Sequence, residues 1–141
     1  MLTAGIDRPA HARAPRRRSA LPSSGRQAAE RRGRLAEHVA AALLILKGYR
    51  ILDRRHRGPF GEVDLIAVRG RRLAFVEVKQ RRSLEAAGTA TTSRQAARLG
   101  DTAERWLWRH PRYRECKIGL DAVLLGAWFV PCHVPNALNS W

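Results

Sequence analysis

The sequence is short of acidic residues and of lysine. Its 12 Asp and Glu stand against 27 Lys and Arg, which gives a formal net charge of +15, and only three of those 27 basic residues are lysine. A balance this basic points to a polyanionic partner, nucleic acid before membrane, although it carries no information about the fold. We therefore expect a nucleic-acid partner and no membrane association.

Two further shortages exclude other classes of protein. The two cysteines, Cys116 and Cys132, provide no disulfide framework and suit a reducing cytosol, so we expect a cytoplasmic protein. With His133 they lack the paired ligand spacing of a zinc site, and we expect all three to be ordinary strand residues. The longest apolar run, residues 39–46, is far shorter than the roughly 20 residues needed to span a bilayer.

The chain divides into a basic arm and one domain. Residues 1–28 contain three prolines, the run Arg16-Arg17-Arg18 and little acid, a composition that predicts a disordered basic arm. A phosphate-binding tail and a solvated tail without dedicated contacts both fit this composition. An organellar transit peptide is a further interpretation, against which the prolines argue. Residues 29–141 are long enough for a single core.

The residue pattern predicts an α/β domain. Helix-favouring residues from about Ala28 to Lys47, followed by Gly48, predict a first helix that is buried because residues 39–46 are apolar all round. A loop is expected after Lys79, and then a second helix that is capped at residues 91–93 and ends before Pro111. With strands expected at 49–55, 63–68, 73–78, 116–125 and 127–134, the order is αβββαββ, a mixed sheet flanked by helices.

The stretch from Gly61 to Lys79 predicts a β-hairpin. Two apolar strands flank Gly70-Arg71, which can form a two-residue turn with glycine in its first central position. A two- or four-residue loop sets one register, in which Asp64 lies opposite Glu77. Glu62 then lies opposite Lys79, and because strand side chains alternate in direction, all four emerge on one face.

The opposed carboxylates suggest a metal site. At roughly 5 Å between their Cβ atoms, Asp64 and Glu77 would repel each other, and a divalent cation would reverse the sign of that interaction. Mg²⁺ suits two or three carboxylates when a phosphate and water supply its other ligands, and Lys79 could then stabilise phosphorane charge. The alternative is a cross-strand ion pair between Glu62 and Lys79, with Asp64 and Glu77 simply solvated.

Two other features bear on the same chemistry. Glu37 is the one acid at the edge of the buried helical stretch, and it shares a face with small residues such as Gly33. Its carboxylate could therefore approach another element closely. The alternative is an exposed ion pair between Glu37 and Arg34. A stripe along the second helix is either phosphate-facing or merely solvated. Its members are Arg94, Arg98, Arg105 and Arg109.

The hairpin motifs resemble a known family. Gly61-Glu62-Val63-Asp64-Leu65-Ile66, followed by Phe75-Val76-Glu77-Val78-Lys79, looks like the bacterial YraN-like family. That family is related to archaeal Holliday-junction resolvases and is placed in the restriction-endonuclease-like superfamily, which has a PD-(D/E)xK site. The similarity covers about residues 30–138. It implies the restriction-endonuclease-like αβββαβ core and, by analogy with dimeric resolvases, a homodimer.

The resemblance also implies roles for individual residues. Asp64 and Glu77 would be metal ligands, Lys79 the catalytic lysine and Glu37 an accessory carboxylate of the metal shell. The chain departs from the family where Asn-x-Arg is common, since Arg55 and Arg57 occupy those positions.

Two more departures concern substrate contacts and packing. Where the family often has Arg-Phe-Asp, this chain has Gly119-Leu120-Asp121, and Arg94 replaces a lysine expected at the start of the second helix. The three residues of the predicted catalytic site are unaffected by these changes.

Taken together, these features predict a Mg²⁺-dependent endonuclease, with Mn²⁺ as the alternative ion, that acts on branched or single-stranded DNA in repair or recombination. No small-molecule cofactor is expected. Glu62 is an accessory site residue, and the residues expected to bind backbone phosphates are Arg57, Arg81, Arg94 and Arg98. The alternative function is a non-catalytic module that binds DNA or is associated with RNA or the ribosome.

Overall fold

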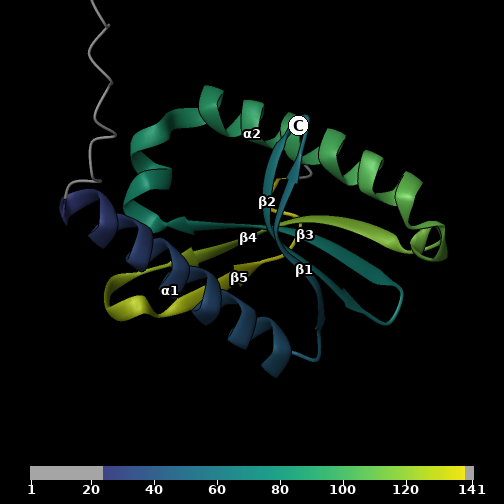
Figure 1. Ribbon diagram of the computed structural model, residues 1–141, viewed down its shortest axis with the longest axis horizontal. Coiled ribbons are helices and arrows are strands. Elements are labelled where there is room, and N and C mark those ends of the chain that lie inside the picture. The colour runs from purple at the N-terminus through teal and green to yellow at the C-terminus, as the bar shows by residue number, and fades with distance from the viewer. Residues whose placement is uncertain (1–23, 139–141) are drawn as a thin grey trace, which may run out of the picture.

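The computed structural model describes residues 24–138, apart from the side chains of residues 81–92, and shows a mixed sheet between two helices (Figure 1). The αβββαββ order and the αβββαβ core predicted from the sequence are both confirmed. The elements are α1 (Ser24–Leu46), β1 (Arg50–Gly58), β2 (Gly61–Arg69), β3 (Arg72–Gln80), α2 (Arg81–Arg109), β4 (Lys117–Leu125) and β5 (Pro131–Val134), with 3₁₀ turns at Pro111–Tyr113 and Ala127–Phe129.

The sheet has its strands in sequence order, β1-β2-β3-β4-β5. All neighbouring pairs are antiparallel except β3 and β4, which are parallel. Parallel neighbours cannot be joined by a tight turn, and α2 provides the crossover between them. The sheet is therefore mixed because of this single helical connection.

Each helix covers one face of the sheet and forms its own core. The apolar stretch of α1 packs on one face and the apolar side of α2 packs on the other, where Phe75 and Trp106 meet edge to face with their ring centroids 5.7 Å apart. The α1 core includes Ala40, Ala41, Leu44, Leu65, Ala67 and Val76, and the α2 core includes Val63, Ile66, Phe75, Leu99 and Trp106.

Three predicted boundaries were wrong. α2 begins at Arg81, not at residues 91–93, because the helix continues through the segment predicted as a loop. Helix formers at 84–87 favour this, and one internal glycine at 88 costs only about 1 kcal/mol. α1 begins at Ser24, so the end of the predicted arm is helical, while residues 1–23 lie outside the described residues. The last strand starts at Pro131, because Trp128 and Phe129 adopt left-handed backbone angles in the preceding turn.

Two expectations from composition concern helices and cysteines. Across residues 24–138, neither α1 nor α2 is apolar enough over a sufficient length to cross a membrane. Cys116 and Cys132 are both free.

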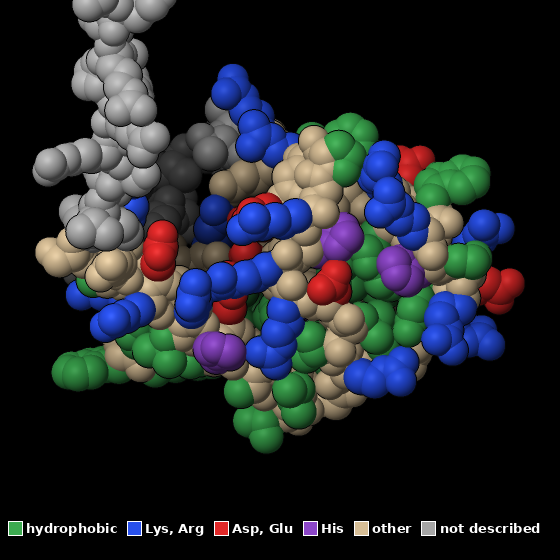
Figure 2. Space-filling view, viewed as in Figure 1, with side chains coloured by type: hydrophobic (Ala, Val, Ile, Leu, Met, Phe, Trp, Pro, Cys, Tyr) green, Lys and Arg blue, Asp and Glu red, His purple; other side chains and the backbone are tan. Residues whose placement is uncertain are grey.

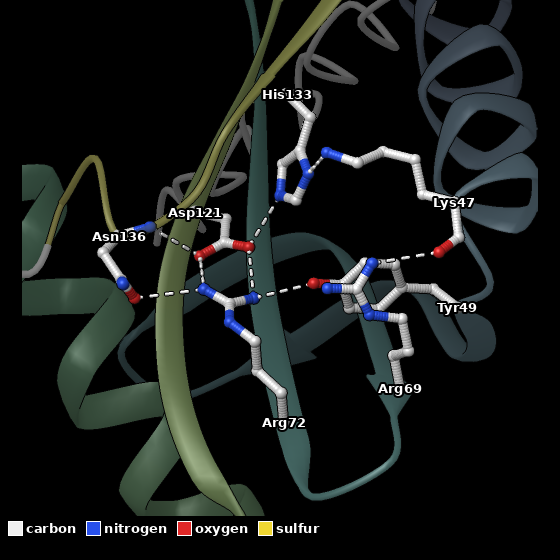
Figure 3. Close-up of polar contacts among 7 residues, drawn as sticks. All are labelled: Lys47, Tyr49, Arg69, Arg72, Asp121, His133 and Asn136. Carbon is white, nitrogen blue, oxygen red and sulfur yellow. Dashed lines mark hydrogen bonds and ion pairs between the residues drawn. The ribbon is translucent and has the colours of Figure 1, made fainter.

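A buried carboxylate links β3, β4 and β5 at the start of β3 (Figure 3). Asp121, on β4, is fully buried and accepts two hydrogen bonds of 2.7 Å from the guanidinium of Arg72. The backbone N–H of Asn136 donates to the same carboxylate at 2.9 Å, and His133 lies 2.7 Å from it. Burial alone would raise the pKa of Asp121, but these donors outweigh burial and hold its pKa below the usual range.

His133 and its neighbours connect this carboxylate to the end of α1. Its Nδ1 lies 2.5 Å from the Lys47 ammonium, which can only donate, so Nε2 carries the proton that is shared with Asp121. Arg72 also donates to the hydroxyl of Tyr49 at 3.1 Å. His133 lies on strand β5 as predicted, but its polar partners lie on β4 and directly after α1, and the spacing of residues along β5 does not reveal them.

Gly119 leaves room for the Arg72 guanidinium, and this gives a test of the network. A Cβ at this position would lie 2.6 Å from Cζ of Arg72 and 2.8 Å from Oδ1 of Asp121. We expect Gly119→Ala to displace Arg72, leave Asp121 partly uncompensated and lower the free energy of unfolding in urea by about 2–4 kcal/mol. Gly100→Ala is the control, because a Cβ at Gly100 would meet only Leu120, at 3.9 Å. The stability of this variant should equal that of the wild type or be slightly higher. Equal stability of the two variants would contradict the prediction.

Candidate active site

The predicted register of β2 and β3 is confirmed. Arg69 pairs with Arg72 across the two-residue turn Gly70-Arg71, and the pairing continues to Leu65 and Val76. Gly70 has φ +57°, a left-handed angle that glycine adopts without steric cost. This register, continued by one position, would place Asp64 opposite Glu77, but the pairing ends at Leu65 and Val76.

The regular alternation of side chains along β2 ends at Asp64. The Asp64 carboxylate accepts a hydrogen bond of 2.7 Å from the backbone N–H of Val78 on β3. Val63 and Leu65 are two residues apart, yet they pack against opposite helices, so the alternation of side chains reverses between them. Strict alternation from the paired part of the strand would have directed Asp64 toward α2, and instead it reaches the α1 side.

The α1 side of Asp64 is a small cavity of about 250 Å³. It lies between the middle of α1, Asp64 and the end of β3. The small residues Gly33 and Ala36 form the α1 wall, and Glu37 and Lys79 project into the same space as Asp64. The structure thus brings together three of the predicted site residues from three different elements.

Each carboxylate of the site is held by a different donor. Glu37 accepts a hydrogen bond of 2.6 Å from Nε of Arg55, and Glu77 lies 3.3 Å from the Lys79 ammonium. The alternative pairing of Glu62 with Lys79 is not what the structure shows, because Glu62 binds Arg57 at 3.0 Å and Lys79 turns to Glu77. A side chain on β1 therefore competes for Glu62, which the hairpin alone could not indicate.

The electrostatics of the site disfavour two negative charges. Burial raises the pKa of Asp64 to about 7, with repulsion from Glu77 adding to the effect and the Val78 N–H partly offsetting it. Burial also raises the pKa of Glu77, although Lys79 opposes the shift. Within the described part of the chain, no three Asp, Glu, His or Cys side chains are already gathered as a metal centre. Asp64 and Glu77 nevertheless form a desolvated oxygen-donor pair that fits a divalent cation of the Mg²⁺ type.

The predicted phosphate-binding arginines have different surroundings. Arg57 is exposed and paired with Glu62, and Arg94 and Arg98 are exposed on α2. The side chain of Arg81 lies outside the described residues, although its backbone opens α2 directly after the end of β3. Figure 2 shows that Lys and Arg side chains outnumber acidic ones over one face of the molecule.

Sequence reasoning missed two features near this site. Arg55 differs from a family pattern, but in a chain so rich in arginine nothing in the sequence marks it as a partner of Glu37. A groove of about 410 Å³ between the β1–β2 turn and α2 was also missed, because its aromatic residues are far apart in sequence. Its lining is Phe60, Asp101, Glu104, Arg105, Trp108 and Arg109.

Comparisons with known proteins give one consistent result. A family model described as "Uncharacterised protein family UPF0102" matches residues 36–125. The chain is 47% identical over 129 residues to a UPF0102 protein of Rhodopseudomonas palustris (strain BisB18), covering 92% of this chain and 94% of that protein. It is 50% identical over 116 residues to UPF0102 protein mlr4633 of Mesorhizobium japonicum, covering 82% and 93%. These names state no activity, so function has to be argued from the site.

Neutralising Asp64 tests the electrostatics of the site. An unfolded aspartate ionises near 3.8, and Asp64 in the folded chain ionises near 7, so the folded state holds the extra proton between these values. The stability contributed by that proton is therefore lost as the pH rises through this window. We expect Asp64→Asn to be more stable than wild type by about 1–4 kcal/mol near pH 8, with a much smaller difference near pH 4.5.

Urea denaturation at the two pH values would measure this effect. Asp101→Asn, which neutralises an exposed aspartate on α2, is the matched control and should change neither value appreciably. A destabilised Asp64→Asn variant at both pH values would contradict the repulsion that we describe.

Proposed function

The chain belongs to the uncharacterised protein family UPF0102, the YraN-like family, and from this premise we propose that it is a metal-dependent endonuclease that acts on DNA. The hairpin motifs had indicated this family, and the family match agrees with them. Because the family label names no reaction, the proposal depends on the geometry and electrostatics of the site.

One observation carries the proposal: Asp64 and Glu77 are two desolvated carboxylates whose charges repel each other beside a lysine. A raised pKa at both residues shows that the protein alone does not compensate their charge. A structural role would be better served by apolar or amide side chains, whereas a bound cation would make both charges favourable. Asp64 and Lys79 line a cavity that leaves room for a phosphate.

The site residues have separable roles in this proposal. Asp64 and Glu77 would hold Mg²⁺ or Mn²⁺, which when bound polarises the scissile phosphate and lowers the pKa of a water. Lys79 faces the cavity with its ammonium next to Glu77, where it would neutralise negative charge that develops on the phosphate. Glu62 would act only indirectly, through its ion pair with Arg57 at the exposed edge of the site.

The DNA would be held by charge. A formal net charge of +15 favours binding to the phosphate backbone, and this contribution falls steeply with salt. The exposed Arg57, Arg94 and Arg98 are the proposed phosphate contacts among the described side chains, and Arg81 follows Lys79 closely in the chain. A cytosolic location and a homodimer remain part of the proposal, from cysteine usage and from analogy respectively.

The groove beside the β1–β2 turn favours a substrate with unpaired nucleotides. Trp108 is 74% exposed and Phe60 is 46% exposed, and single-strand-binding proteins use such aromatic side chains to stack bases. Arg105 and Arg109 line the same groove, as do the acidic Asp101 and Glu104, which would keep phosphates from lying between the aromatic rings.

The groove also lies within reach of the catalytic residues. Phe60 is four positions before Asp64 along the chain, so their backbones are at most about 14 Å apart. That separation is comparable to two or three nucleotides of an extended strand. In this proposal the strand passes from the groove on the α2 side, around the β1–β2 turn, to the cavity on the α1 side.

A non-catalytic nucleic-acid-binding module is the second candidate. The observation in its favour is that each carboxylate near the cavity already has a donor from the protein, namely Arg55 for Glu37, the Val78 N–H for Asp64 and Lys79 for Glu77. Such a module would bind DNA or RNA with a steep salt dependence and would show no divalent-cation site at Asp64.

Cleavage assays distinguish the two candidates. Wild-type protein should cut duplex, flap or four-way-junction DNA in the presence of Mg²⁺ or Mn²⁺, and Glu77→Ala should reduce the rate at least about 100-fold because a metal ligand is lost. Glu115→Gln, which neutralises an exposed glutamate at a distance along the chain, should cut at the wild-type rate. Cleavage by Glu77→Ala at the wild-type rate would contradict the endonuclease assignment.

Binding measurements test the preference for unpaired nucleotides. Without divalent cations, Trp108→Ala should weaken binding of a fluorescently labelled single strand about tenfold, since one stacked base contributes roughly 1–3 kcal/mol. Binding of a blunt duplex should change little. Trp128→Ala is the matched control, because Trp128 is 95% exposed but lies outside the groove. Equal effects of the two substitutions would show that the groove has no special role.

A further inference from the structure

Arg55 is the only cation in the described part of the site that is bonded to Glu37. Its Nε donates to Oε2 of Glu37 at 2.6 Å, and its neighbours on β1 pair with Leu65 and Val63, which places Arg55 across from Asp64. The charges of Asp64 and Glu62 also raise the pKa of Arg55, after the larger contribution of Glu37. A guanidinium on β1 therefore faces the carboxylates of α1 and β2 together.

Arg55 holds this place in a backbone conformation that does not favour arginine. Its φ is +50°, in the left-handed region that asparagine and glycine adopt more readily than other residues. Arginine is therefore present here in spite of a local conformational cost, and its ion pair with Glu37 is the contact that offsets that cost.

The ion pair changes how many carboxylates are available to a metal. Glu37 and Asp64 line one cavity, and Glu77 lies next to Asp64, so three carboxylates could in principle hold two divalent cations. With Arg55 bonded to Glu37, one of the three is already neutralised by a fixed positive charge. Only Asp64 and Glu77 are then left without full compensation.

We propose that Arg55 takes the place of a second divalent cation, so that the site holds one ion on Asp64 and Glu77 while the Arg55 guanidinium remains paired with Glu37. This inference rests on the proposed metal-dependent function. The bond to Glu37 uses only Nε, and a guanidinium has four further N–H donors in a planar array that matches phosphate oxygens. Arg55 is thus a positioning residue for Glu37 and supplies positive charge at the position that a second cation would otherwise occupy.

Metal stoichiometry tests this inference without any measurement of cleavage. Titration of Mn²⁺ into the full-length protein, followed by calorimetry and by the electron paramagnetic resonance of free Mn²⁺, should give one ion per wild-type chain. Arg55→Asn should give two, because Glu37 is released and asparagine fits the left-handed backbone. Arg55→Lys, which keeps a cation next to Glu37, should give one ion again.

Two controls separate the role of this arginine from a general effect of charge. Arg57→Asn removes a similar arginine from the same strand, where it is paired with Glu62 at 3.0 Å, and should leave one ion bound. Glu37→Gln should have no effect on the stoichiometry of the wild-type chain, but combined with Arg55→Asn it should return the count from two ions to one.

The possible results are distinguishable. Two ions in the wild type, or one ion in Arg55→Asn, would overturn the role of Arg55 and leave the metal-dependent function standing. A wild-type chain that binds no Mn²⁺ would overturn the proposed function itself and this inference with it. A gain of an ion in both Arg55→Asn and Arg57→Asn would overturn the inference as well, by showing that net charge alone sets the count.

Discussion

Repulsion between the Asp64 and Glu77 carboxylates is the interaction on which the candidate active site depends. The two residues lie one position beyond the last paired residues of β2 and β3, in surroundings that raise the pKa of both. Three donors partly offset the negative charge of the site without cancelling it. They are the Val78 N–H, which binds Asp64, the Lys79 ammonium, which binds Glu77, and the guanidinium of Arg55, which binds Glu37. The result is a site with spare negative charge in a chain that is otherwise strongly basic.

A second buried carboxylate shows what full compensation looks like in the same fold. Asp121 is completely buried, yet its pKa is lowered, because Arg72, His133 and the backbone of Asn136 all bind it. Asp64 has one backbone donor and a like charge beside it, and its pKa is raised. The contrast separates a carboxylate whose charge is compensated within the sheet from one whose charge is not, although stability alone would favour the first arrangement in both places.

Much of the fold followed from local patterns in the chain. The hairpin register depended on the even length of the Gly70-Arg71 turn and on two apolar strands, and these are short-range properties that a sequence displays directly. The segment before residue 91 was misjudged because Gly88 and several threonines suggest a loop, whereas the crossover between parallel strands requires a long connection that the helix α2 provides. Tertiary context overrode a weak local preference there.

The sequence by itself determined the family, the order of the elements and the register of the paired part of the hairpin, because alternation and turn length act between near neighbours. Only the tertiary structure decided which groups compensate each charge. The pairing of Arg55 with Glu37, of Arg57 with Glu62 and of His133 with Asp121 joins residues on separate elements. In a chain with 27 basic residues, no pattern of spacing identifies which of them reaches a given acid, because that choice is made by packing across the sheet.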